Sequence, residues 1–205
     1  PAGGLVGLVF PSRCPGCGRP AEPLCPACAR SLRPPPAASP PPGVDWWLAL
    51  FAYAGPGREL VAQAKYRGRH AALHWLASRM AAHWRRAGGP HPDVVTWAPT
   101  APARRRARGI DHARELARGV ARGVGVRAAA LLVRGDGPPQ TGLPVTERRR
   151  GPAITARGPV TGSVLVVDDV ATTGATLSAC AVALRRAGAT RVLALTAART
   201  PPGRA

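Results

Sequence analysis

The sequence predicts a parallel α/β domain that follows a small metal-binding module. Residues 164–167 (Val-Leu-Val-Val) form a continuous apolar run, typical of a strand buried on both faces of a parallel sheet. Segments with strand and helix character alternate from about residue 45 onward, as in parallel sheets flanked by helices. Two pairs of cysteines with C-x2-C spacing lie before residue 30, in the pattern of a structural metal site.

Length and charge restrict the function. The 205 residues suffice for one α/β domain plus a small appendage, and 45% of them are hydrophobic. The formal net charge of +19 favours polyanions such as nucleic acid or phosphorylated ligands. Codon usage in a GC-rich genome is a second cause of this charge, because Arg, Ala, Gly and Pro are all abundant. Local clusters of charge are therefore more informative than the total.

The expected location is the cytoplasm. No stretch approaches the ~18 apolar residues that a membrane span needs. Residues 5–10 are too short for the core of a signal peptide, and no basic segment precedes them. In the cytoplasm thiols stay reduced, so paired cysteines indicate metal binding rather than disulfides.

Four cysteines can supply the thiolates of one tetrahedral Zn²⁺. They form two pairs, and seven residues lie between the pairs. They are Cys14, Cys17, Cys25 and Cys28. Two disulfides and free thiols are the alternatives. Gly16 and Gly18 allow the backbone to curl round the metal. Such a site is closed, so we expect a structural zinc with no open position for catalysis.

Proline-rich sequence divides the chain. Residues 34–36 and 40–42 are each three prolines, which predicts an extended, semi-rigid linker over residues 34–44. The zinc module then covers residues 1–33 and the α/β domain residues 45–200. We predict strands at 46–53, 93–98, 128–133, 164–167 and 191–197, a turn at 55–57, and helices at 58–66, 70–87, 111–120 and 175–187. Residues 135–157 lack clear periodicity, which indicates a functional flap or disorder.

An acidic pair and a small-residue loop follow the strand at 164–167. Asp168 and Asp169 stand where this strand is expected to end, and the phosphate loop comes next: Ala171, Thr172, Thr173, Gly174, Ala175 and Thr176. The loop amides and the dipole of the following helix can hold a phosphate. The carboxylates can accept hydrogen bonds from ribose hydroxyls or hold a hydrated Mg²⁺. The plainer alternative is a buried strand that ends in a solvated Asp-Asp turn.

Several arginines are candidates for binding a second anionic group, such as diphosphate. Arg104, Arg105, Arg106 and Arg108 follow the strand at 93–98, and Arg148 lies in the proposed flap. A solvated basic loop is the alternative for the first four. Lys65 is expected at a solvated helix end, and Cys180 is expected to be a small core residue.

Residues 164–176 resemble the phosphoribosyl-diphosphate (PRPP) motif of the type I phosphoribosyltransferases. Across nearly the whole chain, the order of motifs resembles the ComF family of competence-associated proteins. The residues that carry the wider resemblance are Phe10-Pro11, the four cysteines, Tyr53, Arg58-Glu59-Leu60-Val61, Lys65-Tyr66-Arg67-Gly68, Pro99, Arg108-Gly109, Gln140, Leu143, Glu147-Arg148 and the PRPP motif. The chain departs from the family at Ile110, Asp111 and His112, where Phe-Asn-Gln is usual, and these changes leave the PRPP motif intact.

The resemblance implies a type I phosphoribosyltransferase fold with an N-terminal zinc module. It implies that Asp168 and Asp169 contact the ribose, as catalytic and PRPP-binding residues, and that residues 171–176 wrap the 5′-phosphate with Mg²⁺ as the second metal. It also implies a role in DNA uptake during natural transformation, with single-stranded DNA and other competence or DNA-processing proteins as partners. Two functions remain open: a phosphoribosyltransferase, and a single-stranded-DNA-binding protein that keeps a non-catalytic PRPP or nucleotide site.

Overall fold

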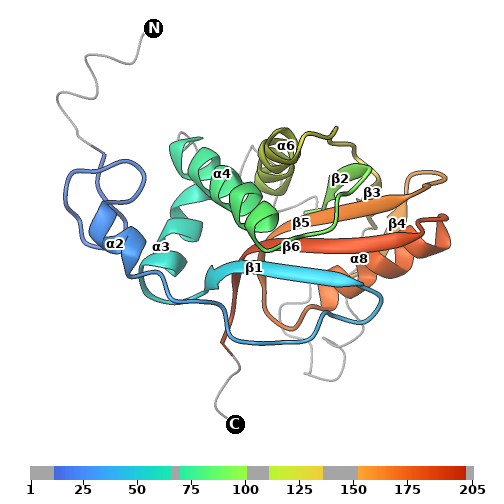
Figure 1. Ribbon diagram of the computed structural model, residues 1–205, viewed down its shortest axis with the longest axis horizontal. Coiled ribbons are helices and arrows are strands. Elements are labelled where there is room, and N and C mark those ends of the chain that lie inside the picture. Colours follow the sequence, from blue (N-terminus) through green and yellow to red (C-terminus); the bar gives the residue numbers. More distant parts are fainter. Residues whose placement is uncertain (1–11, 66–69, 101–110, 136–151, 202–205) are drawn as a thin grey trace, which may run out of the picture.

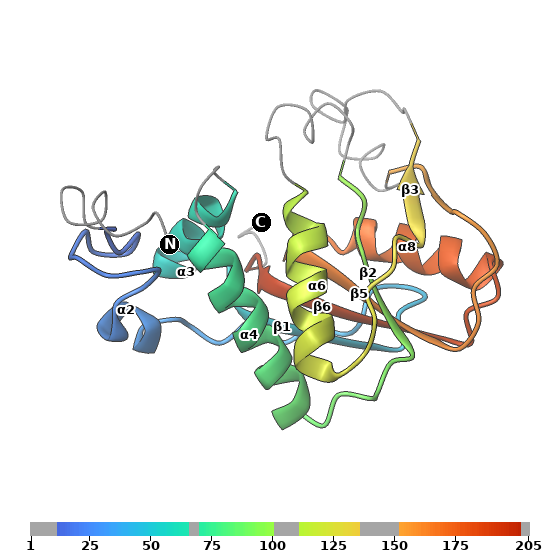
Figure 2. The ribbon, with the colours of Figure 1, turned by 90° about the horizontal axis from the view of Figure 1, so that it is seen from above.

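The computed structural model describes residues 12–65, 70–100, 111–135 and 152–201. Its main sheet has four parallel strands in the order β1-β6-β5-β2. They are β1 (Trp46–Ala52), β6 (Arg191–Arg199), β5 (Ser163–Ala171) and β2 (Val94–Trp97). The helices α3 (Gly55–Ala64), α4 (His70–Arg86) and α6 (His112–Val124) cover one face, and α8 (Ala175–Arg186) covers the other (Figures 1 and 2). This architecture, with a four-cysteine cluster near the N-terminus, confirms the predicted fold class.

Alternating residues of the central strands form two apolar layers. Leu165 and Val167 of β5 pack with the layer beneath α3, α4 and α6, whereas Val164 and Val166 pack with α8. Each of the four is at most 1% exposed, because helices lie on both sides of the strand. This confirms the prediction that residues 164–167 are buried on both faces. Among the described helices, none is long and apolar enough to cross a membrane.

A two-stranded antiparallel ribbon lies beside the main sheet. It consists of β3 (Leu132–Arg134) and β4 (Ile154–Ala156). The prediction of a strand at 128–133 was wrong in its bounds: Ala128 makes only an isolated parallel bridge to Val95 of β2. The sequence reading also missed β4, because a three-residue strand is too short to show a period.

Helix α3 begins earlier than expected. The predicted turn at 55–57 is its first turn, since Pro56 stands at a position that needs no hydrogen-bond donor. Gly57 is buried there, and a β-carbon on it would lie 2.8 Å from the Phe51 ring. Gly57 thus lets α3 approach β1 closely.

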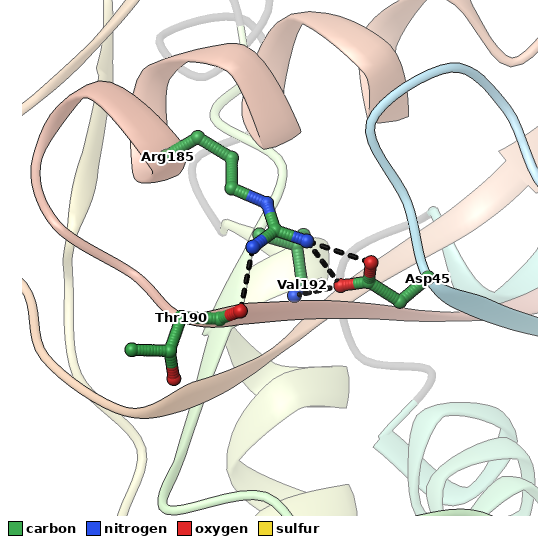
Figure 3. A network of polar contacts seen from close by, with 4 residues as sticks. All are labelled: Asp45, Arg185, Thr190 and Val192. Carbon is green, nitrogen blue, oxygen red and sulfur yellow. Dashed lines mark hydrogen bonds and ion pairs between the residues drawn. The ribbon is translucent and has the colours of Figure 1, made fainter.

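Hydrogen bonds attach the segment 34–44 and its flanking residues to the α/β domain. Just before the segment, the carbonyl of Arg33 accepts from the amide of Ala52 (2.9 Å), and within it the carbonyl of Pro36 accepts from Arg199 (2.8 Å). Just beyond the segment, Asp45 accepts hydrogen bonds from Arg185 of α8 and from the amide of Val192, each at 2.7 Å (Figure 3). Arg185 also donates to the carbonyl of Thr190, so this network fixes the start of β1 against α8 and β6.

Candidate functional site

The acidic pair lies inside β5 rather than after it. The strand was expected to end at residue 167, but it continues through Ala171 because β6 pairs with it as far as Arg199. Successive strand residues point to opposite faces. Asp168 therefore projects to the side of α8, and Asp169 projects to the side of α3, α4 and α6.

Asp169 forms an ion pair with Lys65, which we expected to lie at a solvated end of a helix. Lys65 is the C-terminal cap of α3, and its Nζ lies 2.9 Å from Oδ2 of Asp169. The two side chains are 26% and 24% exposed, so the pair is partly screened from water. Nothing in the local sequence of Lys65 indicates this contact, which depends on how α3 packs over the sheet.

Asp168 has a shifted acidity. Burial raises the pKa of its carboxyl to about 8, and the negative charge of Asp169 adds to the rise. The amide of Asp169, which donates to Oδ1 of Asp168 at 2.8 Å, acts in the opposite direction, as do the charges of Lys65 and Arg134. The raised pKa favours the protonated form of Asp168, which can donate one hydrogen bond as well as accept others.

The phosphate loop leads directly into α8. Gly174 caps this helix with φ of +77°, a conformation that favours glycine. The hydroxyl of Thr173 accepts from the amide of Ala175 (3.3 Å), and the carbonyl of Gly174 accepts from Ser178 (2.9 Å). Thr172 and Thr173 are exposed, so their hydroxyls face solvent at the positive end of the helix dipole.

Part of the proline-rich segment closes one side of this loop. Pro41 is buried, and a β-carbon on Gly174 would lie 2.7 Å from its Cγ. A β-carbon on Gly43 would lie 3.2 Å from Cβ of Ala181 in α8. Residues 41–44 therefore pack against the phosphate loop and against α8.

The four predicted metal ligands converge. The Sγ atoms of Cys14, Cys17, Cys25 and Cys28 all lie within 4.8 Å of one another, and the cysteines are not bridged. Cys17 Sγ and Cys25 Sγ are 3.6 Å apart, close to the ~3.8 Å that a tetrahedral site with Zn–S bonds of about 2.3 Å requires. The donor set therefore fits a metal ion.

Backbone hydrogen bonds lower the pKa values of two of these thiols, Cys14 and Cys25. Burial acts to raise the pKa of Cys14, but the amides of Cys25, Gly16 and Cys17 outweigh it and lower this pKa to about 6. The pKa of Cys25 is also lowered, chiefly by the amide of Cys28, which donates to its Sγ at the start of α2 (Pro26–Arg30). A bound cation would stabilise all four thiolates.

Gly16 matters for space rather than for its backbone angles. A β-carbon at this position would lie 2.8 Å from Cys28 Sγ and 2.9 Å from Cβ of Pro56 in α3. Gly18, by contrast, directly follows Cys17 and has φ of +73°, a backbone conformation that favours glycine. The metal module is therefore packed directly against the α/β domain.

The predicted diphosphate residues lie outside the described part of the chain. These are Arg104, Arg105, Arg106, Arg108 and Arg148. A different basic group borders a cavity at the end of β2, and sequence reasoning missed it. Its arginines are Arg114, Arg118, Arg134 and Arg157. The available signal was the spacing of Arg114 and Arg118, which puts them one turn apart on α6.

Fold and site together define a parallel α/β protein with a candidate anion site at the carboxyl edge of its sheet and a four-cysteine metal site. No protein-family model matches the sequence, and no curated protein matches it either.

Solved structures do resemble the chain. One is the glutamine PRPP amidotransferase from B. subtilis complexed with ADP and GMP (24% identity, TM-score 0.44, 66% of this chain and 30% of that one). A second is described as the allosteric regulatory enzyme of purine biosynthesis (21%, 0.45, 66% and 30%). A third is a purine phosphoribosyltransferase from Pyrococcus horikoshii Ot3 (15%, 0.39, 65% and 90%). The chain thus spans under a third of the length of the first two proteins.

Proposed function

We propose that this chain is a PRPP-binding protein of the phosphoribosyltransferase type. The observation that carries the proposal is the end of β5, where two carboxylates are followed at once by a glycine-bearing loop and a helix N-terminus. In parallel α/β sheets, ligands bind outside the carboxyl ends of the strands. A sugar that bears a phosphate matches such a site, because carboxylates bind hydroxyls and helix N-termini bind phosphate.

In this proposal the phosphate loop, residues 171–176, binds the 5′-phosphate through its amides and the Thr172 and Thr173 hydroxyls. Asp169 accepts hydrogen bonds from the ribose hydroxyls once they displace Lys65. The raised pKa of Asp168 favours its protonated form, which can both donate and accept. The oxygen-rich donor set suits a hard cation, and Mg²⁺ bound with PRPP would neutralise charge on the diphosphate.

Transfer would form a bond from an acceptor atom to the anomeric carbon of the ribose. The bond from that carbon to diphosphate would break, with its electron pair leaving on the diphosphate, and the acceptor's proton would pass to solvent. The chain's contribution is to hold the sugar and stabilise the positive charge that develops on the ring. Asp168 and Asp169 are the proposed catalytic residues, and Arg104, Arg105, Arg106, Arg108 and Arg148 stay candidates for the diphosphate.

The resemblance to the ComF family supports a narrower proposal. In it, the four cysteines hold a structural Zn²⁺ in a reducing cytoplasm. The protein acts in DNA uptake during natural transformation, together with other competence or DNA-processing proteins. The spacing of the four thiols and the lowered pKa values of Cys14 and Cys25 support zinc in particular, since only the thiolate is a ligand.

Binding of single-stranded DNA is the second candidate, with the PRPP site retained but not catalytic. The formal net charge of +19 and the arginines at the end of β2 favour it. Trp84 is buried, so it cannot stack on bases. A steep loss of oligonucleotide affinity between 50 and 200 mM salt would support this function, because it reports phosphate contacts (about tenfold or more for several contacts).

Calorimetric titration of PRPP with Mg²⁺ tests the first proposal. We expect one site per chain in the wild type and at least tenfold weaker binding in the Asp168→Asn/Asp169→Asn variant. Glu59→Gln is the matched control, since it removes an exposed carboxylate of α3. A wild type that does not bind PRPP would refute the proposal. Diphosphate release on addition of candidate acceptors then distinguishes a transferase from a binding protein.

A further inference from the structure

A cavity of about 420 Å³ lies between the end of β2, helix α6 and the β3–β4 ribbon. Its volume is in the range of small-molecule binding sites. The described residues that line it include Trp97, Asp111, Arg114, Arg118, Arg134 and Arg157. Neither the proposed ribose contacts nor the four cysteines belong to it, so its chemistry needs its own explanation.

Positive charge dominates this basic cavity. Besides Arg134, whose charge also acts on Asp168, three arginines line it (Arg114, Arg118 and Arg157), against a single carboxylate among the described lining residues, that of Asp111. This carboxylate already accepts the amide of Arg114 as the cap of α6 (3.3 Å). Arg114 and Arg118 repel each other across one helical turn, and the exposed Glu115–Arg118 contact at 3.3 Å compensates only one of them. By contrast, Arg185 is paired with Asp45 elsewhere in the fold. An anion in the cavity would balance the excess.

Apolar side chains also line the basic cavity. They are those of Trp97, which is half-buried, Leu132 and Val133. Val133 is 36% exposed, which makes it one of the few large apolar side chains that face solvent in the described part of the chain. Aromatic side chains stack on the flat faces of heterocyclic rings. An indole beside guanidinium groups is therefore suited to a heterocycle with a negative substituent.

The basic cavity adjoins the acidic pair. Trp97 is the register partner of Val167, the residue that directly precedes Asp168 in β5. Arg134 lies close enough to Asp168 that its charge lowers the pKa of that carboxyl against the effect of burial. A ligand in the cavity would thus lie next to a sugar held by Asp168 and Asp169.

We propose that the basic cavity binds an anionic heterocycle, a flat ring that carries a carboxylate or a phosphate, as the second ligand of the site. The assignment rests on the proposed function, in which the acidic pair and the phosphate loop hold the phosphoribosyl donor. The ring lies on Trp97, and its negative group contacts Arg114 and Arg118. The cavity thereby selects the acceptor by charge as well as by shape.

The test compares matched probes that differ only in charge. Orotate is measured against uracil, and nicotinate against nicotinamide, by calorimetric titration into the full chain. We expect at least one of the two anions to bind ten times or more tightly than its neutral partner. Equal affinity within both pairs, or no binding by any of the four probes, would overturn the proposal.

Variants then locate the binding. Arg114→Gln/Arg118→Gln should weaken the anion tenfold or more, whereas Arg122→Gln, an exposed arginine of the same helix outside the cavity lining, should not change it. An unchanged affinity in the double variant would overturn the proposal. So would a (dT)12 oligonucleotide that binds through Arg114 and Arg118 while neither orotate nor nicotinate does.

The two proposals can fail separately. PRPP should bind the Arg114→Gln/Arg118→Gln variant within threefold of the wild type, because these residues lie outside the ribose contacts. Conversely, Asp168→Asn/Asp169→Asn should lose PRPP and keep the anionic heterocycle. A wild type that does not bind PRPP would refute the proposed function. A wild type that binds PRPP but does not prefer the anionic rings would refute only the ligand proposed for the basic cavity.

Discussion

At the scale of single residues, Asp168 and Asp169 have different environments because β5 presents them on opposite faces. Asp169 meets the ammonium group of Lys65 at 2.9 Å, so its negative charge is compensated. Burial raises the pKa of Asp168 to about 8, and the negative charge of Asp169 adds to the rise. The two neighbouring carboxyl groups thus lie in different electrostatic environments.

The raised pKa of Asp168 predicts a specific dependence of stability on pH. In the unfolded chain an aspartate titrates near pH 4, so between pH 4 and about 8 the folded state holds one more proton than the unfolded state. The free energy of unfolding should therefore fall as pH rises through this window, by at most about 1.4 kcal/mol per pH unit from this group. Asp168→Asn should remove that fall and be more stable than the wild type at pH 9.

Urea denaturation at a series of pH values measures this effect. Glu59→Gln serves as the control and should keep the wild-type dependence on pH, because its carboxylate is exposed. A parallel decline in the wild type and in Asp168→Asn would contradict the assignment of the shifted pKa to Asp168.

Lys65 should act on the acidic pair through its charge. Lys65→Met should raise the pKa of Asp168 further, since the ammonium group lowers it. Lys65→Arg should leave it near that of the wild type. The carboxyl carbon of Asp168, followed by NMR across the titration, reports this pKa directly. A wild-type midpoint in Lys65→Met would show that the contact with Asp169 has no electrostatic effect on its neighbour.

At the scale of elements, small residues determine how closely α4 and α6 pack. A β-carbon on Gly119 would lie 2.4 Å from Cβ of Ala77, and one on Gly123 would lie 2.5 Å from Cβ of Ala81. These positions need glycine for contact between helices, although glycine is unfavourable inside a helix. Close packing here holds α6 over β2, where it forms one side of the basic cavity.

Gly119→Ala should therefore destabilise the protein despite its better helix propensity. Overpacking should outweigh the gain of about 1 kcal/mol in propensity, for a net loss of about 1–2 kcal/mol in the free energy of unfolding. Ala77→Gly opens the space opposite, so the double variant Gly119→Ala/Ala77→Gly should be more stable than the sum of the single effects. Additive losses in denaturant unfolding would mean that the two positions do not contact each other.

At the scale of the whole molecule, the four-cysteine module shares the core of the α/β domain. Cys14, Cys25 and Cys28 belong to the same buried cluster as Phe51 and Leu60. A metal at this site would therefore stabilise the attachment of the N-terminal module as well as the module itself.

Removal of the metal should consequently lower the melting temperature of the chain. Native mass spectrometry should find one zinc per wild-type chain and none in Cys14→Ser. Cys180→Ala is the control, because this buried thiol lies in the other apolar layer, beneath α8, and should leave the zinc content unchanged. An intact, folded wild type without metal would contradict the zinc assignment.

Local patterns predicted what depends on neighbouring residues. The buried run at 164–167 and the convergence of four cysteines both followed from spacing along the chain. The core position of Cys180 followed from the face of its helix, and the structure confirms it as fully buried. These features need no knowledge of which elements meet.

Features that depend on distant contacts were not predictable in this way. The extension of β5 to Ala171 requires pairing with β6, and the partner of Asp169 requires α3 to lie over the sheet. The basic cavity combines residues of β2, α6 and the β3–β4 ribbon, whose strands are too short to recognise. The charged partners of the site residues therefore depend on tertiary packing, whereas the side chains that could bind a ligand were recognisable from the sequence.

The most direct test of the central claim is a crystal structure of the chain with ribose 5-phosphate. We expect the phosphate within hydrogen-bond distance of the amides of residues 172–176, and the ribose hydroxyls on Asp168 and Asp169. Density for the phosphate at this loop, lost in crystals of Asp168→Asn/Asp169→Asn, would support the account. A ribose 5-phosphate bound elsewhere, with the loop and both aspartates untouched, would contradict it.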